Sequence, residues 1–169
     1  GLTAAARQSP RVIYLATLGK AAGVFGAAVA AHADVAAWLA QKARSYVYTT
    51  ATPPLLAAAL LASLQQIAAG QARRDRLRRH IQHVREGLGA LPRWRLMPSA
   101  TPIQPLLIGE NAEALAVSGK LLEQGLLVPA IRTPTVPRGG ARLRISLSAS
   151  HTEAEVGRLV SALARLAAT

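Results

Sequence analysis

The stretch of sequence that decides the fold reads Val12-Ile13-Tyr14-Leu15-Ala16-Thr17-Leu18-Gly19-Lys20-Ala21-Ala22-Gly23. Its first six residues form a continuous apolar run, which is typical of a buried strand. Glycines at positions 23 and 26 predict a turn, and residues 27–30 predict a second strand of small residues. Lys20 is therefore expected just past the carboxyl end of the first strand.

The rest of the chain alternates short apolar runs with helical patterns, which is typical of an α/β fold. Asp34 is expected to cap a helix that runs to about residue 44, and residues 46–50 are expected to be extended. A long helix with a weak point at Gly70 is expected from Pro53 onward. Beyond it, the pattern predicts strands at 103–108, 126–131 and 142–147, and helices at 111–124 and 152–166.

These patterns divide the chain into three parts. Residues 1–52 are expected to end a large domain, residues 53–92 to form a connecting helix, and residues 93–169 to form a small α/β lobe. Within this lobe, Thr152 and Glu155 have the spacing of a capping box at the start of the last helix.

The composition restricts the class of protein. The 169 residues are 51% hydrophobic and include no cysteine, and the alanine-rich stretches are interrupted before they reach the length of a bilayer span. We therefore expect a globular protein without a membrane span, a disulfide or a thiolate metal site. The cytoplasm is the expected location.

The formal charge of +12 raises the question of a polyanionic partner. Six arginines lie between residues 73 and 85, but the apolar residues among them repeat at helical spacing, which indicates a helix with basic outer faces. A solvated helix face is the simpler interpretation, and a nucleic-acid-binding module is the alternative. No aromatic side chain lies among these arginines to stack on a base. His80 and His83 are expected to be a solvated pair, and no metal site is predicted.

Lys20 is the main candidate for chemistry. A residue just past a strand lies where α/β folds bind ligands, and apolar walls around a lysine would favour its reaction with a carbonyl group. Thr17, three residues earlier, could donate its hydroxyl to a phosphate, and the nearby glycines would let the backbone approach. From spacing alone, a solvated surface lysine remains the alternative to a cofactor lysine.

Four segments resemble the α-oxoamine synthase family of fold-type I pyridoxal-phosphate enzymes. Thr17 to Ala27 is similar to the cofactor-lysine motif of that family. The other segments are Tyr48 to Pro54, Ala130 to Pro137, and Ala141 to Thr152. They occur in the family's order over nearly the whole chain. The form of Ile131 to Pro137 is closest to the family's biotin-pathway member.

The resemblance implies pyridoxal 5'-phosphate as the cofactor and Lys20 as the residue that carries it. Lys20 would also remove and return a proton at the substrate's α-carbon. Thr17 would bind the cofactor phosphate, and Thr49 and Thr50 would reach the phosphate from the partner subunit of a homodimer.

The resemblance also implies the substrates, which are L-alanine and a pimeloyl thioester on coenzyme A or a carrier protein, condensed with loss of carbon dioxide. Arg144 would pair with the amino-acid carboxylate, since a guanidinium forms two parallel hydrogen bonds with it. Thr135 would face substrate, and Arg132 would either contact the acyl chain or be structural. Other members of the family, of the glycine C-acetyltransferase or 5-aminolevulinate synthase type, remain alternatives.

The chain departs from the family pattern before Lys20. The family has an aspartate that pairs with the pyridine nitrogen and a histidine that stacks on the ring, both upstream of the lysine. The 19 residues before Lys20 contain neither, and both aspartates of the chain follow it. We therefore expect an inactive carboxy-terminal part of a longer enzyme, or an enzyme whose other half comes from another chain.

Overall fold

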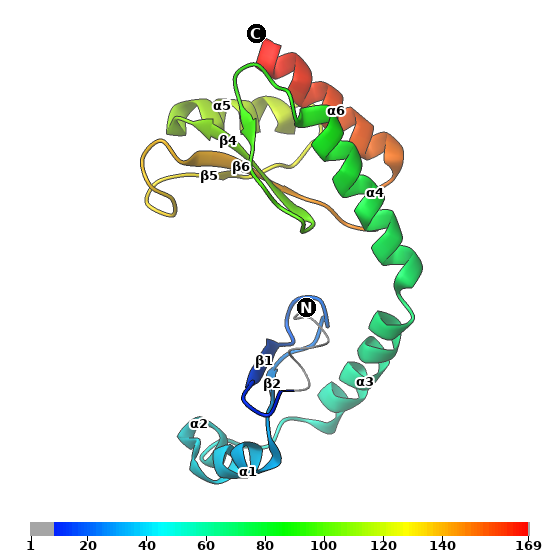
Figure 1. The fold of residues 1–169 in the computed structure, drawn as a ribbon, viewed down its shortest axis with the longest axis vertical. Coiled ribbons are helices and arrows are strands. Elements are labelled where there is room, and N and C mark those ends of the chain that lie inside the picture. Colours follow the sequence, from blue (N-terminus) through cyan, green and yellow to red (C-terminus); the bar gives the residue numbers. More distant parts are fainter. Residues whose placement is uncertain (1–8, 169) are drawn as a thin grey trace. The chain divides into compact units, whose positions relative to one another are not determined.

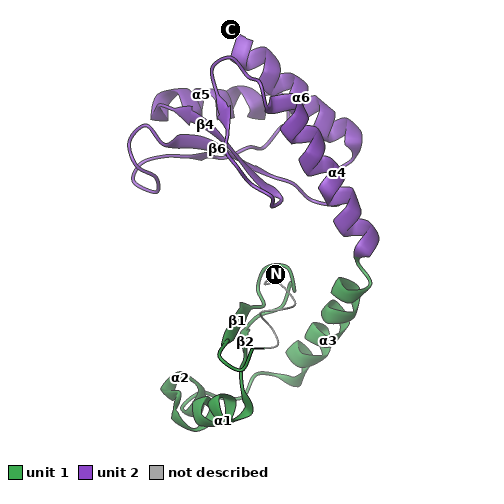
Figure 2. Ribbon diagram, in the orientation of Figure 1, with its two compact units in different colours: residues 1–70 green, residues 71–169 purple. Residues whose placement is uncertain are grey.

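The chain folds into two compact units (Figure 1, Figure 2). The computed structural model describes residues 9–168, and the chain divides into unit 1 (residues 1–70) and unit 2 (residues 71–169). Both units combine helices and strands, which confirms the predicted α/β class.

Unit 1 begins with a pair of short antiparallel strands. Strand β1 (Tyr14–Thr17) pairs with β2 (Ala27–Ala30), so that Tyr14 lies opposite Ala30 and Thr17 opposite Ala27. The predicted strand at 27–30 is confirmed, and the one at 12–17 is confirmed from residue 14. In the connection between them, the N–H of Leu18 donates to the carbonyl oxygen of Gly26 at 2.9 Å and continues the pairing.

Two helices follow β2, and both differ in detail from the prediction. Helix α1 (Ala33–Lys42) is capped by His32, whose Nδ1 accepts from the Asp34 N–H at 3.4 Å, so the predicted cap at Asp34 is wrong. Asp34 lies in the first turn, where its carboxylate interacts favourably with the positive end of the helix dipole. Helix α2 (Arg44–Val47) contradicts the extended conformation expected from residue 46, because the Ala43 carbonyl accepts from the N–H groups of residues 46 and 47 and starts a new turn.

The segment expected to be a long helix is broken at the predicted weak point. Helix α3 (Pro54–Ala68) ends with two backbone hydrogen bonds, from the Ala69 N–H to the Gln65 carbonyl and from the Gly70 N–H to the Ile67 carbonyl. Helix α4 (Gln71–Leu88) begins directly after Gly70. Glycine costs a helix interior about 1 kcal/mol relative to alanine, which makes Gly70 a favourable place to end one helix. Among the described residues, no single helix has the length and apolar composition of a membrane span; α3 and α4 meet that test only when taken together across their break.

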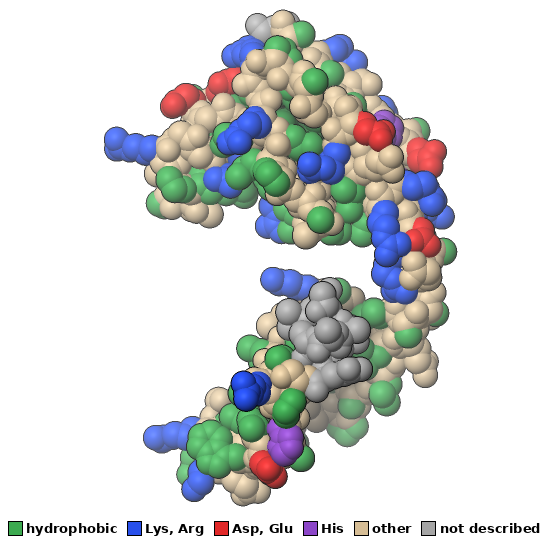
Figure 3. All heavy atoms as spheres, viewed as in Figure 1, with side chains coloured by type: hydrophobic (Ala, Val, Ile, Leu, Met, Phe, Trp, Pro, Cys, Tyr) green, Lys and Arg blue, Asp and Glu red, His purple; other side chains and the backbone are tan. Residues whose placement is uncertain are grey.

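Unit 1 has almost no buried side chains. Gly70 is the only buried residue between residues 9 and 70. Phe25, Tyr48 and Leu55 are each more than 75% exposed. Hydrophobic side chains accordingly stand at the surface of unit 1 (Figure 3). The strand that was expected to be buried is thus largely exposed.

Unit 2 is built on a four-stranded antiparallel sheet of order β3-β4-β6-β5. The strands are β3 (Arg95–Leu96), β4 (Ile103–Gly109), β5 (Ala130–Ile131) and β6 (Ala141–Ser146). The predicted strands at 103–108 and 142–147 are confirmed to within one residue. The strand predicted at 126–131 forms only at its last two residues, and β3, which has two residues, was too short to show a pattern.

The helices of unit 2 lie on one side of this sheet (Figure 1). Helix α5 (Asn111–Leu122) packs on β4 and β6, and α4 packs against α6 (Glu153–Ala168). The side chains between the helices and the sheet form one continuous core, whose largest fully buried members include Leu88, Leu106, Leu121, Leu143, Ile145 and Leu163. The helices α4 and α6 approach closely at Gly87, where an added Cβ would lie 2.4 Å from Val160 Cγ1.

Side-chain and backbone caps define the helix ends in unit 2. The N–H of Glu155 donates to Thr152 Oγ1 at 3.2 Å and the N–H of Thr152 donates to Glu155 Oε2 at 2.7 Å, which confirms the predicted capping box. Hydrogen bonds from Thr152 lower the pKa of Glu155. At the end of α5, the N–H of Leu126 donates to the carbonyl oxygen of Leu121 at 2.9 Å, and Gly125 between them has φ +75°. This turn occupies the first residues of the strand predicted at 126–131.

Two polar side chains are buried in unit 2. His80 is 1% exposed and its Nε2 donates to the carbonyl oxygen of His151 at 2.9 Å, so the expectation of a solvated His80 and His83 pair is wrong for His80. Its position beside Val84 on the packed face of α4 explains this difference. Gln104 accepts from Arg85 and donates to the carbonyl oxygen of Thr101 at 2.6 Å, which fixes the loop before β4.

Candidate functional site

Lys20 lies in the loop of residues 18–26 that joins β1 to β2, and Thr17 is the last residue of β1. The Gly23 N–H donates to the Lys20 carbonyl at 2.9 Å, and Ser63 Oγ on α3 donates to the Ala22 carbonyl at 2.7 Å. Gly23 has φ +63°, a conformation that disfavours residues with a Cβ. The backbone of the loop is therefore held in place on α3.

The side chains of Thr17 and Lys20 are both exposed. The apolar walls expected around Lys20 are not present in the part of the chain that the structure describes. The donor set nevertheless fits pyridoxal phosphate, because a primary amine can react with its aldehyde and a hydroxyl can donate to its phosphate. An added Cβ at Gly23 would meet no atom within 4 Å, so a ligand could approach the backbone there.

Thr49 and Thr50 belong to a different segment of unit 1, the loop after α2. The Thr49 N–H donates to the Tyr46 carbonyl at 3.4 Å, and both threonine side chains are exposed. Beside them, the Arg44 guanidinium lies 6.0 Å from the centre of the Tyr48 ring. Hydroxyl groups of this loop are therefore available to an outside group.

Arg132 and Thr135 lie in unit 2, in the loop that joins β5 to β6. The Thr135 N–H donates to the Arg132 carbonyl at 2.9 Å, and both side chains are exposed. At the other end of the loop, Arg142 Nε donates to the Gly140 carbonyl at 2.8 Å. The loop thus has a defined backbone from which Thr135 and Arg132 project.

Arg144 lies on β6, next to that loop, on the face of the sheet away from the helices. Leu143 and Ile145 on either side of it are buried in the core, and side chains alternate along a strand. Arg144 lies opposite Pro105 of β4, and Arg142, two residues earlier on β6, lies opposite Leu107 of β4. Leu107 also pairs with Arg95 on β3. This open face therefore carries the three arginines Arg95, Arg142 and Arg144.

Arg95 was not identified from the sequence, because its strand was not predicted. A signal was nevertheless present, since an arginine next to the buried Trp94 must point away from the core if the segment is extended. Arg142 was also not assigned, and its contact with Gly140 could not be found from sequence spacing.

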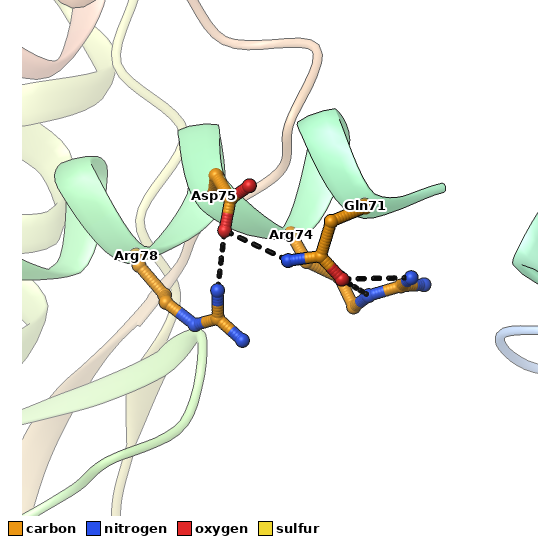
Figure 4. A network of polar contacts seen from close by, with 4 residues as sticks. All are labelled: Gln71, Arg74, Asp75 and Arg78. Atoms are coloured by element: carbon orange, nitrogen blue, oxygen red, sulfur yellow. Dashed lines mark hydrogen bonds and ion pairs between the residues drawn. The ribbon is translucent and has the colours of Figure 1, made fainter. Parts of the chain in front are cut away.

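The arginine-rich helix α4 pairs part of its charge internally (Figure 4). Asp75 accepts hydrogen bonds from Arg78 and from Gln71, and Gln71 in turn accepts from Arg74 at 3.1 Å. Arg76 donates to the Ala149 carbonyl at 3.3 Å, and Arg85 to the Ser99 carbonyl at 3.2 Å. Several of these arginines therefore serve the structure of unit 2.

No group of three or more His, Cys, Asp or Glu side chains within residues 9–168 is arranged to hold a metal ion.

Known proteins resemble the chain over nearly its whole length. It is 64% identical over 167 residues, which is 99% of this chain, to 8-amino-7-oxononanoate synthase of Thiobacillus denitrificans. Its fold matches the 8-amino-7-oxononanoate synthase of Francisella tularensis, with a TM-score of 0.79 and 30% identity over 91% of this chain. Its fold also matches the serine palmitoyltransferase of Sphingomonas wittichii, with a TM-score of 0.82 and 26% identity over 91% of this chain. The resemblance to 8-amino-7-oxononanoate synthase expected from the form of Ile131 to Pro137 is thus confirmed.

The chain spans less than half the length of these proteins. It covers 43% of the Thiobacillus protein, 45% of the Francisella chain and 39% of the Sphingomonas chain. Residues 2–163 match the family model described as aminotransferase class I and II. Because that match includes most of the sequence, the chain belongs to the family of class I and II aminotransferases.

Proposed function

We propose that this chain is part of a pyridoxal-phosphate-dependent acyltransferase that makes 8-amino-7-oxononanoate for biotin biosynthesis. The reaction joins L-alanine to a pimeloyl thioester, carried by coenzyme A or a carrier protein, with loss of carbon dioxide. The observation that carries the proposal is the 64% identity to an enzyme of that name over 99% of the chain. The exposed hydroxyl of Thr17 at the end of β1 and the exposed amine of Lys20 in the loop that follows support it.

Four residues of unit 1 are proposed to hold the cofactor. Lys20 binds it covalently, while Thr17, Thr49 and Thr50 donate hydroxyl hydrogens to its phosphate. When bound, pyridoxal phosphate withdraws electrons from the substrate α-carbon. The Lys20 amine would accept the proton of that carbon and later return it. Its exposure on a loop held to α3 would give the amine room for both roles.

The proposed substrate contacts lie in unit 2. Arg144 holds the amino-acid carboxylate through two parallel hydrogen bonds, and its exposed position beside Pro105 leaves its guanidinium accessible. Thr135 orients the substrate from the adjacent loop. Arg132 starts that loop and is proposed to contact the acyl chain.

The same proposal assigns residues 1–52 to the end of the cofactor-binding domain, 53–92 to the connection and 93–169 to the small domain. It also includes a cytoplasmic homodimer, as the family resemblance implies. Since the chain spans about 40% of the length of its relatives, residues 1–169 alone are expected to be inactive. Another α-oxoamine synthase remains the alternative enzyme.

A nucleic-acid-binding module is the second candidate, and the basic outer face of α4 favours it. Lys and Arg side chains gather along this helix in the surface view (Figure 3). The internal pairing of Asp75 with Arg78 and the contacts of Arg76 and Arg85 weaken that candidate. DNA affinity that fell steeply with salt would support it.

Lys20→Ala tests the proposed function in the complete gene product that contains these residues. The purified protein is expected to show an absorbance band of lysine-linked pyridoxal phosphate and to form a ketone product from L-alanine and pimeloyl thioester. Lys20→Ala should remove both. Lys42→Ala is the matched control, because Lys42 is an exposed lysine at the end of α1. An unchanged band in Lys20→Ala would reject the assignment of Lys20.

A further inference from the structure

The open face of the unit 2 sheet has an unusual distribution of charge. One cross-strand row contains Arg95, Leu107, Arg142 and Ile131, and the neighbouring pair is Pro105 with Arg144. None of these residues is acidic, so three guanidinium groups surround an apolar floor without a carboxylate in the same rows. Such a surface is complementary to a ligand that combines negative charge with a hydrocarbon chain.

The three arginines differ in how they are held. Arg142 donates to the Gly140 carbonyl at 2.8 Å and lies 3.4 Å from Met97 Sδ, so its guanidinium is largely committed to the loop between β5 and β6. Arg144 and Arg95 are exposed, and neither side chain forms a hydrogen bond or ion pair with another described residue. These two arginines are therefore available to a ligand.

The spacing of Arg95 and Arg144 suits a molecule with two separated carboxylates. Arg95 lies two strands from Arg144 and two residues along, which places their Cα atoms about 12 Å apart from standard sheet dimensions. An alanine carboxylate joined to an extended pimeloyl group lies about 10 Å from the distal carboxylate, from eight carbon–carbon bonds of standard length. Arginine side chains can span the remaining difference, and Leu107 and Pro105 lie between them beneath the methylene chain.

We propose that Arg95 binds the distal carboxylate of the acyl donor and thereby selects a dicarboxylic acyl thioester over a neutral one. This inference rests on the proposed function, in which Arg144 holds the amino-acid carboxylate. Arg95 is a specificity residue remote from the reacting atoms. It stabilises the bound donor before and during the reaction, so its loss should appear mainly in KM.

The test compares two acyl donors in the complete gene product: pimeloyl thioester and its ω-methyl ester, which has no distal charge. Arg95→Gln is expected to lower kcat/KM for the free acid by about 10- to 100-fold, as for the loss of one charge-assisted hydrogen-bonded pair. The value for the methyl ester should change less than about 3-fold, within the range of a neutral contact. Arg95→Lys should restore part of the preference, because lysine keeps the charge without the planar fork.

Arg165→Gln is the matched control. Arg165 is an exposed arginine on α6, in the helical layer that covers the other face of the sheet, and its effect on both donors should be small. An equal loss for both donors in Arg95→Gln, or no loss for either, would overturn the role of Arg95 while the proposed function stands. A wild-type enzyme that condenses neither donor with L-alanine would overturn the proposed function and this inference with it.

Discussion

Unit 2 buries a continuous core between three helices and one face of its sheet, whereas the described part of unit 1 buries only Gly70. The difference does not come from composition. Helix α3 contains no charged residue and is more apolar than α4, yet none of its side chains is buried. Among the described residues, both units have three helices, but those of unit 2 pack on a four-stranded sheet, while unit 1 has only two short strands.

This contrast separates two kinds of site. The Arg144 face rests on strands whose other side is packed, so its geometry is fixed by unit 2 itself. The Lys20 loop is held by its own backbone hydrogen bonds and by one contact from Ser63. A hairpin of two strands is marginal in isolation, so the stability of the Lys20 loop should depend on what covers unit 1.

The largest expected effect comes from truncating one buried and one exposed leucine in the 169-residue chain. Leu88→Ala, at a fully buried position, should lower the free energy of unfolding by about 2–5 kcal/mol. Leu61→Ala, at a position 64% exposed on α3, should change it by less than about 0.5 kcal/mol. Urea denaturation followed by circular dichroism and by tryptophan fluorescence, to which the buried Trp94 and the exposed Trp38 both contribute, measures both. A large loss for Leu61→Ala would show that unit 1 is covered in solution.

Two glycine substitutions test how tightly unit 2 is packed. Gly87→Ala would place a Cβ 2.4 Å from Val160 Cγ1 and is expected to cost about 1–3 kcal/mol by forcing α4 and α6 apart. Gly119→Ala is the control, because an added Cβ on α5 meets no atom within 4 Å and should stabilise the helix by up to about 1 kcal/mol. Thermal unfolding would distinguish them, and equal melting temperatures would contradict the close approach of the helices.

The smallest expected effect concerns the N-terminal cap of α6 in unit 2. Helix α3 in unit 1 has no side-chain cap to compare with it. The hydrogen bonds from Thr152 lower the pKa of Glu155, so the stability that the cap contributes is present above the unfolded pKa and is lost as the pH falls through the folded pKa. The difference in urea midpoint between the wild type and Glu155→Gln should therefore be larger at pH 7 than at about pH 3. Glu153→Gln, in the same helical turn, should show less pH dependence. Equal pH dependence would argue against the cap.

Sequence patterns predicted the elements whose signals are local. The capping box at Thr152, the weak point at Gly70 and the strand at 103–108 all depend on neighbouring residues, and each is confirmed. Predictions failed where a distant contact decides the result. His80 was expected to form a solvated pair with His83 because no acidic or third metal ligand lies nearby in the sequence, but the carbonyl of His151, 71 residues away, gives it a buried partner.

The candidate site divides in the same way. The motif around Lys20 and the loop with Thr135 could be recognised from sequence, since both are contiguous runs of residues. Their roles remain predictions. The open face with Arg95 could not be found this way, because strand register across β3, β4 and β6 brings together residues separated by up to 49 positions in the chain, from Arg95 to Arg144.

The sequence by itself therefore determined the α/β class, the family resemblance, most helix and strand positions and the identity of Lys20 as the candidate cofactor lysine. Only the tertiary structure decided which apolar surfaces are buried. Helix α3 is more apolar than α4 and buries no side chain, whereas the less apolar α4 buries three. The tertiary structure also decided which arginines share a face. The physical reason is that periodicity fixes which way a side chain points from its own strand or helix, whereas burial and charge clustering depend on the elements that pack beside it.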